Sequence, residues 1–460
     1  MNISINISAD SNEPTSQIKI IKKAKNDSSL FNYKYDGKSL NCEIASDESV
    51  SDNGQAESLR RSGHKLWKLI HDRKIKSVVF HSDISLKNAC IFLAEGLLLS
   101  TYVFDKYKSE KQDRHLKEIL IDDKNVSNEN ISTLYKTVNA NFIARDLVNE
   151  PPAKLTATDL SNSIVSLGKK YGFNTTVLEK AKIQSLKMGG LLSVNLGSET
   201  PPTFNILEWN PKGAKNKKPV VLIGKGVVYD TGGLSLKPTT NSMDLMKSDM
   251  AGSAAVIGAF CALASLNLPL HVIGLIAATD NRPGKNAYAP GDVIHMFDGT
   301  SVEVMNTDAE GRLTLADALS YAKKYKPGLV IDIATLTGSA ARAIGKEGIV
   351  FMGNADTKTL NGLKMSGQKV HERLVLFPLW NDYAEHIKSD IADLKNIGGV
   401  EAGAITAGKF LEHFTDYPWI HMDIAGSAFL TSEDSYRGKN ATGVGVRLIV
   451  EFLNQISNES

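Results

Sequence analysis

The spacing of apolar residues becomes regular in the last two-thirds of the chain. From about residue 200 onward, short apolar runs rich in valine and isoleucine alternate with longer stretches of helical spacing. Short runs bounded by glycine or proline are typical of buried strands, and alternating strands and helices favour a mainly parallel sheet covered on both faces. The strands predicted in this way are Thr203–Trp209, Val220–Gly224, Leu270–Ala278, Leu329–Ile333, Ile349–Gly353 and Trp419–Ile424.

The earlier part of the chain is more polar and mixed. Its predicted strands are Gln17–Ala24 and Ser77–His81, its predicted helices are Leu59–Arg73, Leu86–Phe104 and Asn128–Asn149, and an acidic loop covers Ser46–Gln55. Pro151 and Pro152 follow the last helix, and proline stops helices and disfavours α geometry in the residue before it. We therefore place a domain boundary there.

These patterns predict an α/β fold with two domains. Residues 1–150 would form a smaller N-terminal α/β domain that ends in a linker helix. Residues 151–460 would form a larger C-terminal domain, with a central mainly parallel or mixed sheet flanked by helices. A chain of 460 residues is long enough for two domains with ample cores.

Composition excludes several classes of protein. The chain is 42% hydrophobic and 23% charged, as in ordinary globular proteins, and its net charge of +2 creates no strong field for nucleic acid or membrane. Cys42, Cys90 and Cys261 form no Cys-x-x-Cys pair, which fits a reducing cytoplasm. The N-terminus lacks the pattern of a secretory signal, and no apolar run approaches the ~18 residues of a membrane span.

The segment Asn306–Leu313, which reads Asn-Thr-Asp-Ala-Glu-Gly-Arg-Leu, carries the strongest chemical signal. In an extended backbone, alternate side chains point to one side, so Asp308, Glu310 and Arg312 would converge. Converging carboxylates repel each other unless a cation lies between them, and hard divalent cations take oxygen ligands. A simpler interpretation is a polar loop in which Asp308 caps the helix that begins near Leu313.

More charged residues lie upstream, beside the predicted strand Val220–Gly224. Lys225 and Asp230 are expected at the end of this strand and in the loop after it, and Asp249 precedes a helix rich in small residues. Ligands of open α/β sheets bind outside the carboxyl ends of strands, so these residues are expected to share a crevice with Asp308. The glycines around Lys225 match neither phosphate-binding glycine motif. Asp249 could both cap the helix and bind a metal.

Taken together, the motifs resemble those of the leucyl aminopeptidase family, the M17-type cytosol aminopeptidases. The resemblance is carried by Gly224-Lys225-Gly226, Asp230-x-Gly-Gly, Lys237, Met243-Asp244-Leu245-Met246-x-x-Asp249 and Asn306–Leu313. It runs from about Val220 to near Phe452, and Ala144–Pro152 resembles the family's junction between domains. It implies a metal-dependent aminopeptidase that removes Leu-like or Met-like N-terminal residues from short peptides.

The resemblance also implies cofactors, an assembly and a role for each matching residue. Two divalent metal ions per subunit are expected, Zn²⁺ or Mn²⁺ with Mg²⁺ or Co²⁺ also suited, together with a catalytic bicarbonate and a cytoplasmic homohexamer. The matching metal ligands are Lys225, Asp230, Asp249, Asp308 and Glu310. Lys237 would donate to the developing gem-diolate oxygen, and Arg312 would anchor the bicarbonate. Their alternatives are structural: an ordinary ion pair for Lys225, and a bridge from Arg312 to Asp308 or Glu310.

The positions matching the family's first side-chain pocket are Met246, Thr335, Gly338, Ala425 and Ala428. Methionine and alanine would make this pocket apolar and adaptable, although Met246 and the alanines could equally be core residues. The chain departs from the family pattern in two places. The spacing from Asp230 to Asp249 is one residue longer, within Thr239–Ser242, and Lys247 stands where arginine is expected.

The sequence contains no motif for a histidine-ligated zinc protease or for a serine nucleophile. The ten histidines form neither His-Glu-x-x-His nor His-x-x-Glu-His, and no Gly-x-Ser-x-Gly nucleophile elbow is present. The alternative from another class is DNA binding, since some bacterial members of the family bind DNA as architectural or regulatory proteins. The closest basic cluster is Lys19, Lys22, Lys23 and Lys25. That is few for phosphate-driven binding, so neither nucleic acid nor membrane is expected as a partner.

Overall fold

The computed structural model describes residues 3–7, 16–23 and 30–459. It divides into two compact units. The first consists of Met1–Asn139 with Thr431–Lys439, and the second of Ala140–Leu430 with Asn440–Ser460. The domain boundary predicted at residue 150 stays a prediction. The predicted end of the first strand, at Ala24, lies outside the described residues.

The first unit is built on a six-stranded sheet in the order β1-β6-β5-β2-β4-β3. Its elements are β1 (Ser4–Ile7), β2 (Ser16–Lys22), β3 (Phe31–Tyr35), β4 (Leu40–Ser46), α1 (Asp52–Asp72), β5 (Ser77–Ser82), α2 (Ala89–Ser100), β6 (Glu118–Asp122) and the start of α3 (Asn128–Asn149). Among the described strands of this sheet, only β3 runs antiparallel to its neighbour. The predicted loop ends too late, because Ser51 caps α1 and the helix begins seven residues before Leu59.

The second unit contains the remaining elements of the chain. Up to the motif Asn306–Leu313 these are α4 (Ala157–Tyr171), β7 (Asn174–Leu178), α5 (Lys180–Ser185), α6 (Gly189–Asn195), β8 (Thr203–Trp209), β9 (Val220–Asp230), η1 (Met243–Ser248), α7 (Ala251–Leu266), β10 (Val272–Asn281), β11 (Val293–His295) and β12 (Ser301–Glu303). After it come α8 (Gly311–Ala322), η2 (Lys323–Tyr325), β13 (Leu329–Ala334), α9 (Gly338–Ile344), η3 (Gly345–Glu347), β14 (Ile349–Gly353), α10 (Thr357–Val370), β15 (Leu374–Leu376), η4 (Asn381–Ile387), β16 (Leu394–Lys395), α11 (Gly403–Glu412), β17 (Trp419–Asp423), β18 (Phe429–Leu430), β19 (Asn440–Ala441) and α12 (Val446–Glu459). The short η5 (Ser435–Arg437) between β18 and β19 belongs to the first unit.

The central sheet of the second unit has eight strands in the order β15-β14-β17-β13-β9-β10-β8-β7. Strands β17, β13, β9 and β10 are parallel neighbours, while β8 and β7 add an antiparallel edge. This confirms the predicted α/β class with a mixed, mainly parallel sheet. The carboxyl ends of the four central strands therefore reach the same edge of the sheet, where α/β proteins bind ligands.

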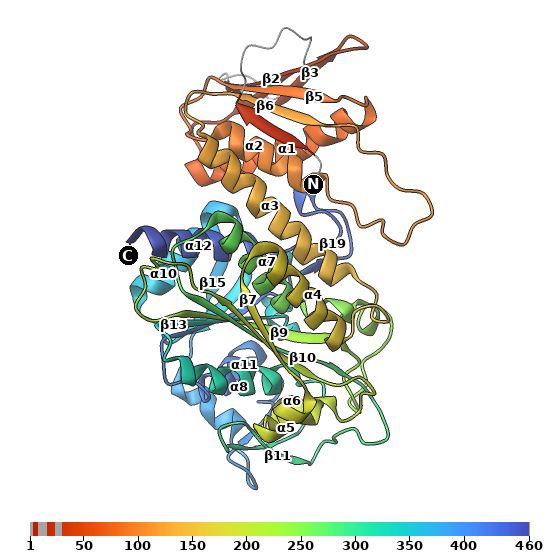
Figure 1. Cartoon of the computed structure of the whole chain (residues 1–460), viewed down its shortest axis with the longest axis vertical. Coiled ribbons are helices and arrows are strands. Elements are labelled where there is room, and N and C mark those ends of the chain that lie inside the picture. The colour runs from red at the N-terminus through yellow and green to blue at the C-terminus, as the bar shows by residue number, and fades with distance from the viewer. Residues whose placement is uncertain (1–2, 8–15, 24–29, 460) are drawn as a thin grey trace. The chain divides into compact units, whose positions relative to one another are not determined.

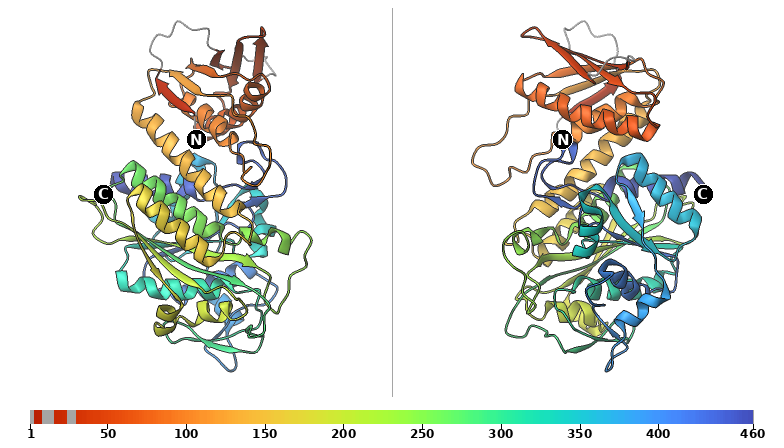
Figure 2. Two further views of the ribbon diagram at one scale, coloured as in Figure 1. Left: turned by 45° about the vertical axis from the view of Figure 1, so that its right-hand side comes forward. Right: turned by 180° about the vertical axis from the view of Figure 1, so that it is seen from behind.

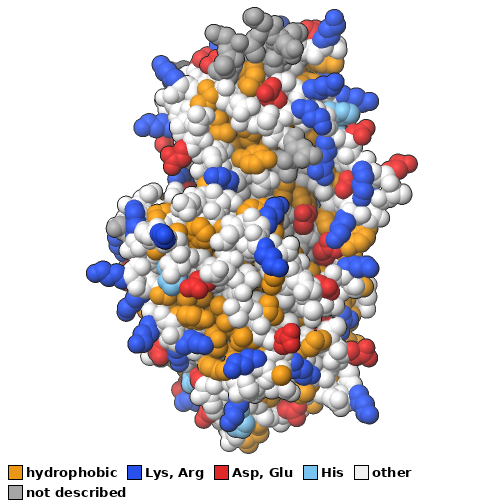
Figure 3. Space-filling model, in the orientation of Figure 1, with side chains coloured by type: hydrophobic (Ala, Val, Ile, Leu, Met, Phe, Trp, Pro, Cys, Tyr) orange, Lys and Arg blue, Asp and Glu red, His pale blue; other side chains and the backbone are white. Residues whose placement is uncertain are grey.

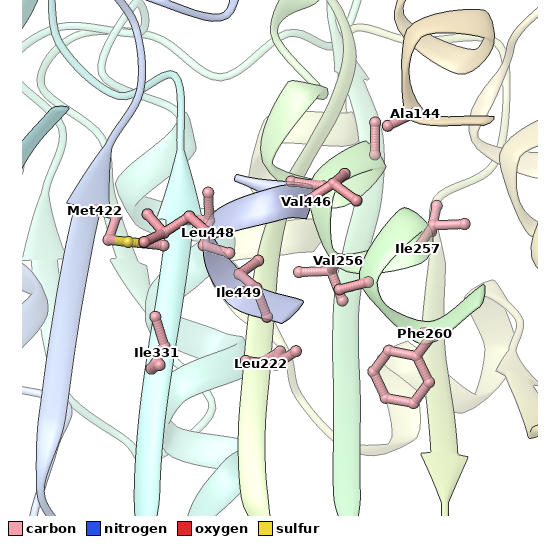
Figure 4. Packing of buried hydrophobic residues seen from close by; sticks show 14 of the residues in the cluster. Ala144, Leu222, Val256, Ile257, Phe260, Ile331, Met422, Val446, Leu448 and Ile449 are labelled. Carbon is pink, nitrogen blue, oxygen red and sulfur yellow. The ribbon is translucent and has the colours of Figure 1, made fainter. Parts of the chain in front are cut away.

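Helices cover both faces of this sheet (Figure 1). On one face, Leu222 of β9, Ile331 of β13 and Met422 of β17 pack against Val256 of α7 and Ile449 of α12 (Figure 4). A second cluster fills the other face, between the sheet and helices α6, α8 and α11. The view from behind shows the same layering (Figure 2). Burial on both faces explains why the central strands are continuous apolar runs.

Among the described residues, the helical segment Met243–Leu266 is long and apolar enough by length and composition to cross a bilayer, and its most apolar window has a mean hydropathy of 1.6. Of its most apolar window, 83% is buried inside the protein, as in the core helix of a globular domain. Counting uninterrupted apolar residues overlooks this segment because Ser248, Asp249 and Ser253 interrupt it. Its α-helical part, α7, packs against β9 and β13.

Candidate metal centre

Strand β9 carries the first two candidate residues. Lys225 and Asp230 are 3% and 2% exposed. Both lie within the strand, which continues past Gly224 to Asp230, so the prediction that Asp230 lies in a loop was wrong. Pairing with β10 continues as far as Asp230 opposite Asn281, and these backbone hydrogen bonds extend the strand past its glycines.

Glycine at position 224 lets α7 approach the strand closely. A Cβ atom on Gly224 would lie 2.4 Å from the Cα atom of Ser253, in the first turn of that helix. The close approach brings the start of α7 beside Lys225. Asp249, just before this helix, consequently reaches the lysine, with 2.7 Å between Lys225 Nζ and Asp249 Oδ1.

The segment carrying Asp308 and Glu310 is a turn rather than an extended strand. Glu310 has helical dihedral angles (φ −76°, ψ −36°), and α8 begins at Gly311. The predicted alternation of side chains along an extended segment is therefore wrong here. Arg312 reaches the site from the first turn of a helix. The simpler capping interpretation is not supported either, because the residue at the N-cap of α8 is Glu310, whose side chain makes no capping hydrogen bond.

Three carboxylates nevertheless converge. Asp230, Asp308 and Glu310 each offer an oxygen, and these oxygens lie within 4.8 Å of one another. Lys237 Nζ lies 2.9 Å from Asp230 Oδ2 and 2.5 Å from Asp308 Oδ1, and Lys225 Nζ lies 2.9 Å from Glu310 Oε1. The structure thus joins the metal ligands predicted from the sequence into one cluster of four carboxylates, including Asp249, around two lysines.

Burial governs the ionisation of this cluster. It raises the pKa values of Asp230, Asp249 and Asp308, and neighbouring carboxylates add to each shift. Burial alone would lower the pKa values of Lys225 and Lys237, but the surrounding carboxylates outweigh it and raise both. Each of these three aspartates is therefore costly to ionise without a cation beside it, so the cluster selects for positive charge.

Two buried oxygens in the cluster fit a metal. Among the described residues, neither Asp249 Oδ2 nor Glu310 Oε2 accepts a hydrogen bond. A buried carboxylate oxygen without a donor is costly, and a divalent cation would satisfy it. The donor set of carboxylates with one amine therefore fits hard or borderline divalent ions.

Arg312 is buried next to the cluster. Within the part of the chain that the structure describes, its Nε and Nη1 atoms donate no hydrogen bond, and no ion pair joins it to Asp308 or Glu310. The predicted alternative of a structural bridge is therefore wrong. Burial lowers the pKa of the guanidinium to about 10, opposed by Glu310 and Asp423, so it stays charged at neutral pH. Two unused donors on a planar cation suit a small planar anion.

Comparison with known proteins identifies the family of this chain. A sequence model of the cytosol aminopeptidase family, catalytic domain, matches residues 142–450, and one of the family's N-terminal domain matches residues 50–111. The probable cytosol aminopeptidase of Chlorobaculum tepidum is 49% identical over 380 residues, which cover 78% of this chain and 74% of that one. The chain belongs to the cytosol aminopeptidase family. It is a metal-dependent hydrolase that removes N-terminal residues from peptides.

Further relatives of this aminopeptidase agree. The probable cytosol aminopeptidase of Geobacter sulfurreducens is 44% identical over 368 residues, 78% of this chain and 74% of that one. Among solved structures, the bottromycin maturation enzyme BotP in complex with Mn has a TM-score of 0.86 at 28% identity, covering 97% of this chain and 100% of that one. The two-domain architecture predicted from the sequence is thereby confirmed.

The two departures from the family pattern are both accommodated in the aminopeptidase. The longer spacing before Asp249 falls in an exposed loop, where Asn241 adopts a left-handed conformation (φ 56°) that asparagine tolerates. Lys247 donates a hydrogen bond of 2.8 Å to the carbonyl of Asn149, and its ammonium lies 5.9 Å from the ring of Phe429. Neither change displaces Asp249 from the cluster.

The residues predicted to line the substrate pocket lie in different environments. Thr335 belongs to the cluster, because its Oγ1 donates to Asp249 Oδ1 at 2.8 Å and its carbonyl accepts from Lys225 Nζ at 3.0 Å. Met246 and Ala425 are half-buried, and Gly338 is exposed at the start of α9. Ala428 is 3% exposed within the hydrophobic core, as in the core-packing interpretation.

Sequence reasoning missed the residues that hold the cluster in place. Asn281 at the end of β10, Tyr288 in the loop after it and Asn396 after β16 all bond to the turn that carries Asp308 or to the backbone beside it. Asn281 was recognisable only by its place at the carboxyl end of a predicted central strand. The other two carry no signal in the sequence pattern.

Proposed function

We propose that Asp230, Asp308 and Glu310 hold one divalent cation and that Asp249 and Lys225 complete the ligands of a second. The observation that carries this proposal is the convergence of three carboxylate oxygens within 4.8 Å. Lys225 binds a metal only as a neutral amine, and a cation that neutralises Asp249 and Glu310 would remove what holds its proton. Zn²⁺ and Mn²⁺ are the first candidates, and Mg²⁺ and Co²⁺ also suit the ligands.

When bound, two such cations would supply Lewis acidity and lower the pKa of a water beside them. Lys237 then acts as a charged donor to the substrate oxygen that becomes negative during attack. Its raised pKa keeps it protonated, and its ion pairs to Asp230 and Asp308 hold the ammonium at the cluster. A donor aimed at charge that develops only in the transition state accelerates the reaction.

Arg312 is proposed to bind the bicarbonate. Its unpaired Nε and Nη1 atoms support this role, since a planar guanidinium fork matches a planar oxyanion. A bicarbonate held there would supply a base for the attacking water and an acid for the leaving amine.

The substrate is proposed to be a short peptide with a leucine-like or methionine-like N-terminal residue. Met246, Thr335, Gly338, Ala425 and Ala428 are the proposed pocket residues. Half-buried Met246 supports an apolar and adaptable pocket. Thr335 would place this pocket against the metal ligands, because it bonds directly to Asp249.

The enzyme is proposed to assemble as a cytoplasmic homohexamer. Large apolar side chains on the surface of the second unit support an assembly, with Trp380 63%, Ile391 66% and Val400 97% exposed. Sedimentation should give a mass several times that of one 49.9 kDa chain. A mass near that of a single chain would contradict the proposal.

The DNA-binding alternative gains no support from the structure. Lys19, Lys22 and Lys23 of the predicted basic cluster form ion pairs with Asp83, Glu48 and Asp47 respectively. Lys25 lies outside the described residues. Basic and acidic side chains are interspersed over the face seen in Figure 3. A gel-shift titration at low salt tests this point, because real binding weakens steeply as salt rises.

The experiment that tests the proposed function is hydrolysis of a panel of aminoacyl anilides after chelation and re-addition of Mn²⁺ or Zn²⁺. Activity should vanish on chelation, return with metal and be highest for leucine and methionine. A folded enzyme without activity in any metal, or one indifferent to chelation, would contradict it. Bicarbonate is tested separately, by comparing rates in carbonate-free and bicarbonate-containing buffer.

A further inference from the structure

Asn281 links the two segments that carry the clustered carboxylates. It is the last residue of β10, is fully buried and lies opposite Asp230 in the sheet. Its Nδ2 atom donates to Asp230 Oδ1 at 2.8 Å and to the carbonyl oxygen of Thr307 at 3.0 Å. Thr307 directly precedes Asp308, so one amide group connects the strand of the first carboxylate to the turn of the second.

The orientation of this amide is determined by its surroundings. Both groups that it contacts through Nδ2 are acceptors, so the flipped amide would place oxygen against oxygen twice. The backbone carbonyl of Asn281 accepts hydrogen bonds from the backbone N–H and the hydroxyl of Thr231, and these bonds fix the backbone of Asn281. Gly233 leaves room for the side chain, since a Cβ atom there would lie 2.8 Å from Asn281 Oδ1.

The turn before Asp308 is also held by residues that do not touch a carboxylate of the cluster. Tyr288 donates its hydroxyl to the same Thr307 carbonyl at 2.8 Å. Asn396, fully buried, accepts from the backbone N–H of Met305 at 2.8 Å and donates to the carbonyl of Asn306 at 2.7 Å. The shape of the turn is therefore secured from two other directions, and the contribution particular to Asn281 is its bond to Asp230.

Because of that bond, the two carboxylate oxygens of Asp230 have different partners. Oδ1 accepts from Asn281 and from the backbone N–H of Gly232, each at 2.8 Å. Oδ2 is left facing the interior of the cluster, where it pairs with Lys237 at 2.9 Å. Without the amide, Oδ1 keeps a single donor, and the carboxylate can rotate away from Asp308, which repels it.

We propose that Asn281 is a positioning residue that sets the metal affinity of the site by orienting the Asp230 carboxylate toward the metal. The inference rests on the proposed function, because it takes Asp230 and Asp308 as metal ligands. Partners that hold a ligand from behind typically change metal affinity 10–100-fold when removed. Asn281 acts through Asp230 and is not itself a ligand.

The test measures the Mn²⁺ dissociation constant of metal-free enzyme by calorimetry for wild type, Asn281→Ala and Tyr288→Phe. Asn281→Ala should bind Mn²⁺ roughly 10–100-fold more weakly. Tyr288→Phe, the matched control, removes the other donor to Thr307 and leaves Asp230 untouched, so its affinity should stay within about threefold of wild type. Saturating Mn²⁺ should restore most of the kcat of Asn281→Ala, since the ligands themselves remain.

Equal Mn²⁺ affinity in wild type and Asn281→Ala would overturn the inference, and so would equal weakening in Tyr288→Phe, which would assign the effect to the turn. Asn281→Leu keeps the branched shape of the side chain, in a larger volume, without its donor. It replaces the alanine variant if circular dichroism shows that variant unfolded. Asp308→Ala separates the two levels of the argument. If Asp308→Ala binds Mn²⁺ as wild type does, the proposed function fails. If Asp308→Ala loses Mn²⁺ binding while the Asn281 variants bind Mn²⁺ normally, only the role of Asn281 is refuted.

Discussion

Gly311→Ala should strongly lower the activity of the enzyme without replacing any proposed ligand. Gly311 is the first residue of α8, and its φ angle is in the ordinary negative range, so alanine fits the backbone. A Cβ atom there, however, would lie 2.4 Å from Cε, 2.6 Å from Nζ and 2.9 Å from Cδ of Lys225. The three atoms nearest to the methyl group thus all belong to the side chain of one proposed metal ligand.

The size of the effect follows from these distances. Non-bonded carbon atoms prefer about 3.5–4.0 Å, so the end of the lysine must move by roughly 1 Å. Lys225 is 3% exposed, and its ammonium is held at 2.7 Å from Asp249 and 2.9 Å from Glu310, so a shift of this size breaks both contacts. A misplacement of about 1 Å can cost on the order of 10²-fold in rate, and we expect that loss in kcat.

The assay is leucyl-anilide hydrolysis at saturating Mn²⁺, with circular dichroism to verify the fold. Gly362→Ala in α10 is the matched control, because its new Cβ atom would meet nothing closer than 3.4 Å. Both variants gain the helix propensity of alanine over glycine, up to about 1 kcal/mol. Activity of Gly311→Ala within threefold of wild type would refute the reasoning, as would an equal loss in Gly362→Ala.

Three further predictions concern the cluster and the core beneath it. Asp308→Ala and Glu310→Ala should each abolish hydrolysis and reduce the bound metal measured by atomic emission; full metal content in either would contradict the ligand assignment. Lys237→Ala should lower kcat by roughly 10²–10³ with metal retained, the loss typical of an oxyanion donor, and a rise in KM alone would indicate a binding role instead. Asp317 is fully buried, and burial raises the pKa of its carboxyl from 3.8 to about 7 despite hydrogen bonds from the backbone N–H groups of Leu191 and Phe297. Because the folded pKa lies above the unfolded one, this group should lower the free energy of unfolding by up to about 4 kcal/mol as pH rises from about 4 to 7. Urea titrations should show that slope in wild type and not in Asp317→Asn, and equal slopes would count against the assignment.

The first unit shows where sequence patterns fall short. Strand β4 alternates over its first five residues, with Leu40, Cys42 and Ile44 buried and Asn41 and Glu43 exposed, and it could have been predicted. Strand β3 shows no such alternation, since all but its first residue are exposed at the edge of the sheet. Such a strand is defined by its pairing with β4 rather than by burial, and periodicity does not encode pairing.

The sequence by itself predicted six of the eight strands of the central sheet and the chemical types at the site. The predicted bounds of β8 and β14 match the structure to the residue. Strand β14 is a continuous apolar run, as expected of a strand that is buried on both faces. The motif Asn306–Leu313 contains two carboxylates and a guanidinium in any backbone conformation. The family could therefore be identified even though the expected extended geometry was wrong.

Only the tertiary structure decided how these groups meet. The extension of β9 to Asp230 depends on its pairing with β10, and the bond from Asn281 to Asp230 spans 51 positions. Asn396 reaches the turn at Asn306 across 90 positions. The spacing of residues along a chain predicts which face of a helix or strand a side chain lies on. A hydrogen bond between distant residues forms only after the strands have paired and the helices have packed, because its geometry is fixed to a few tenths of an ångström.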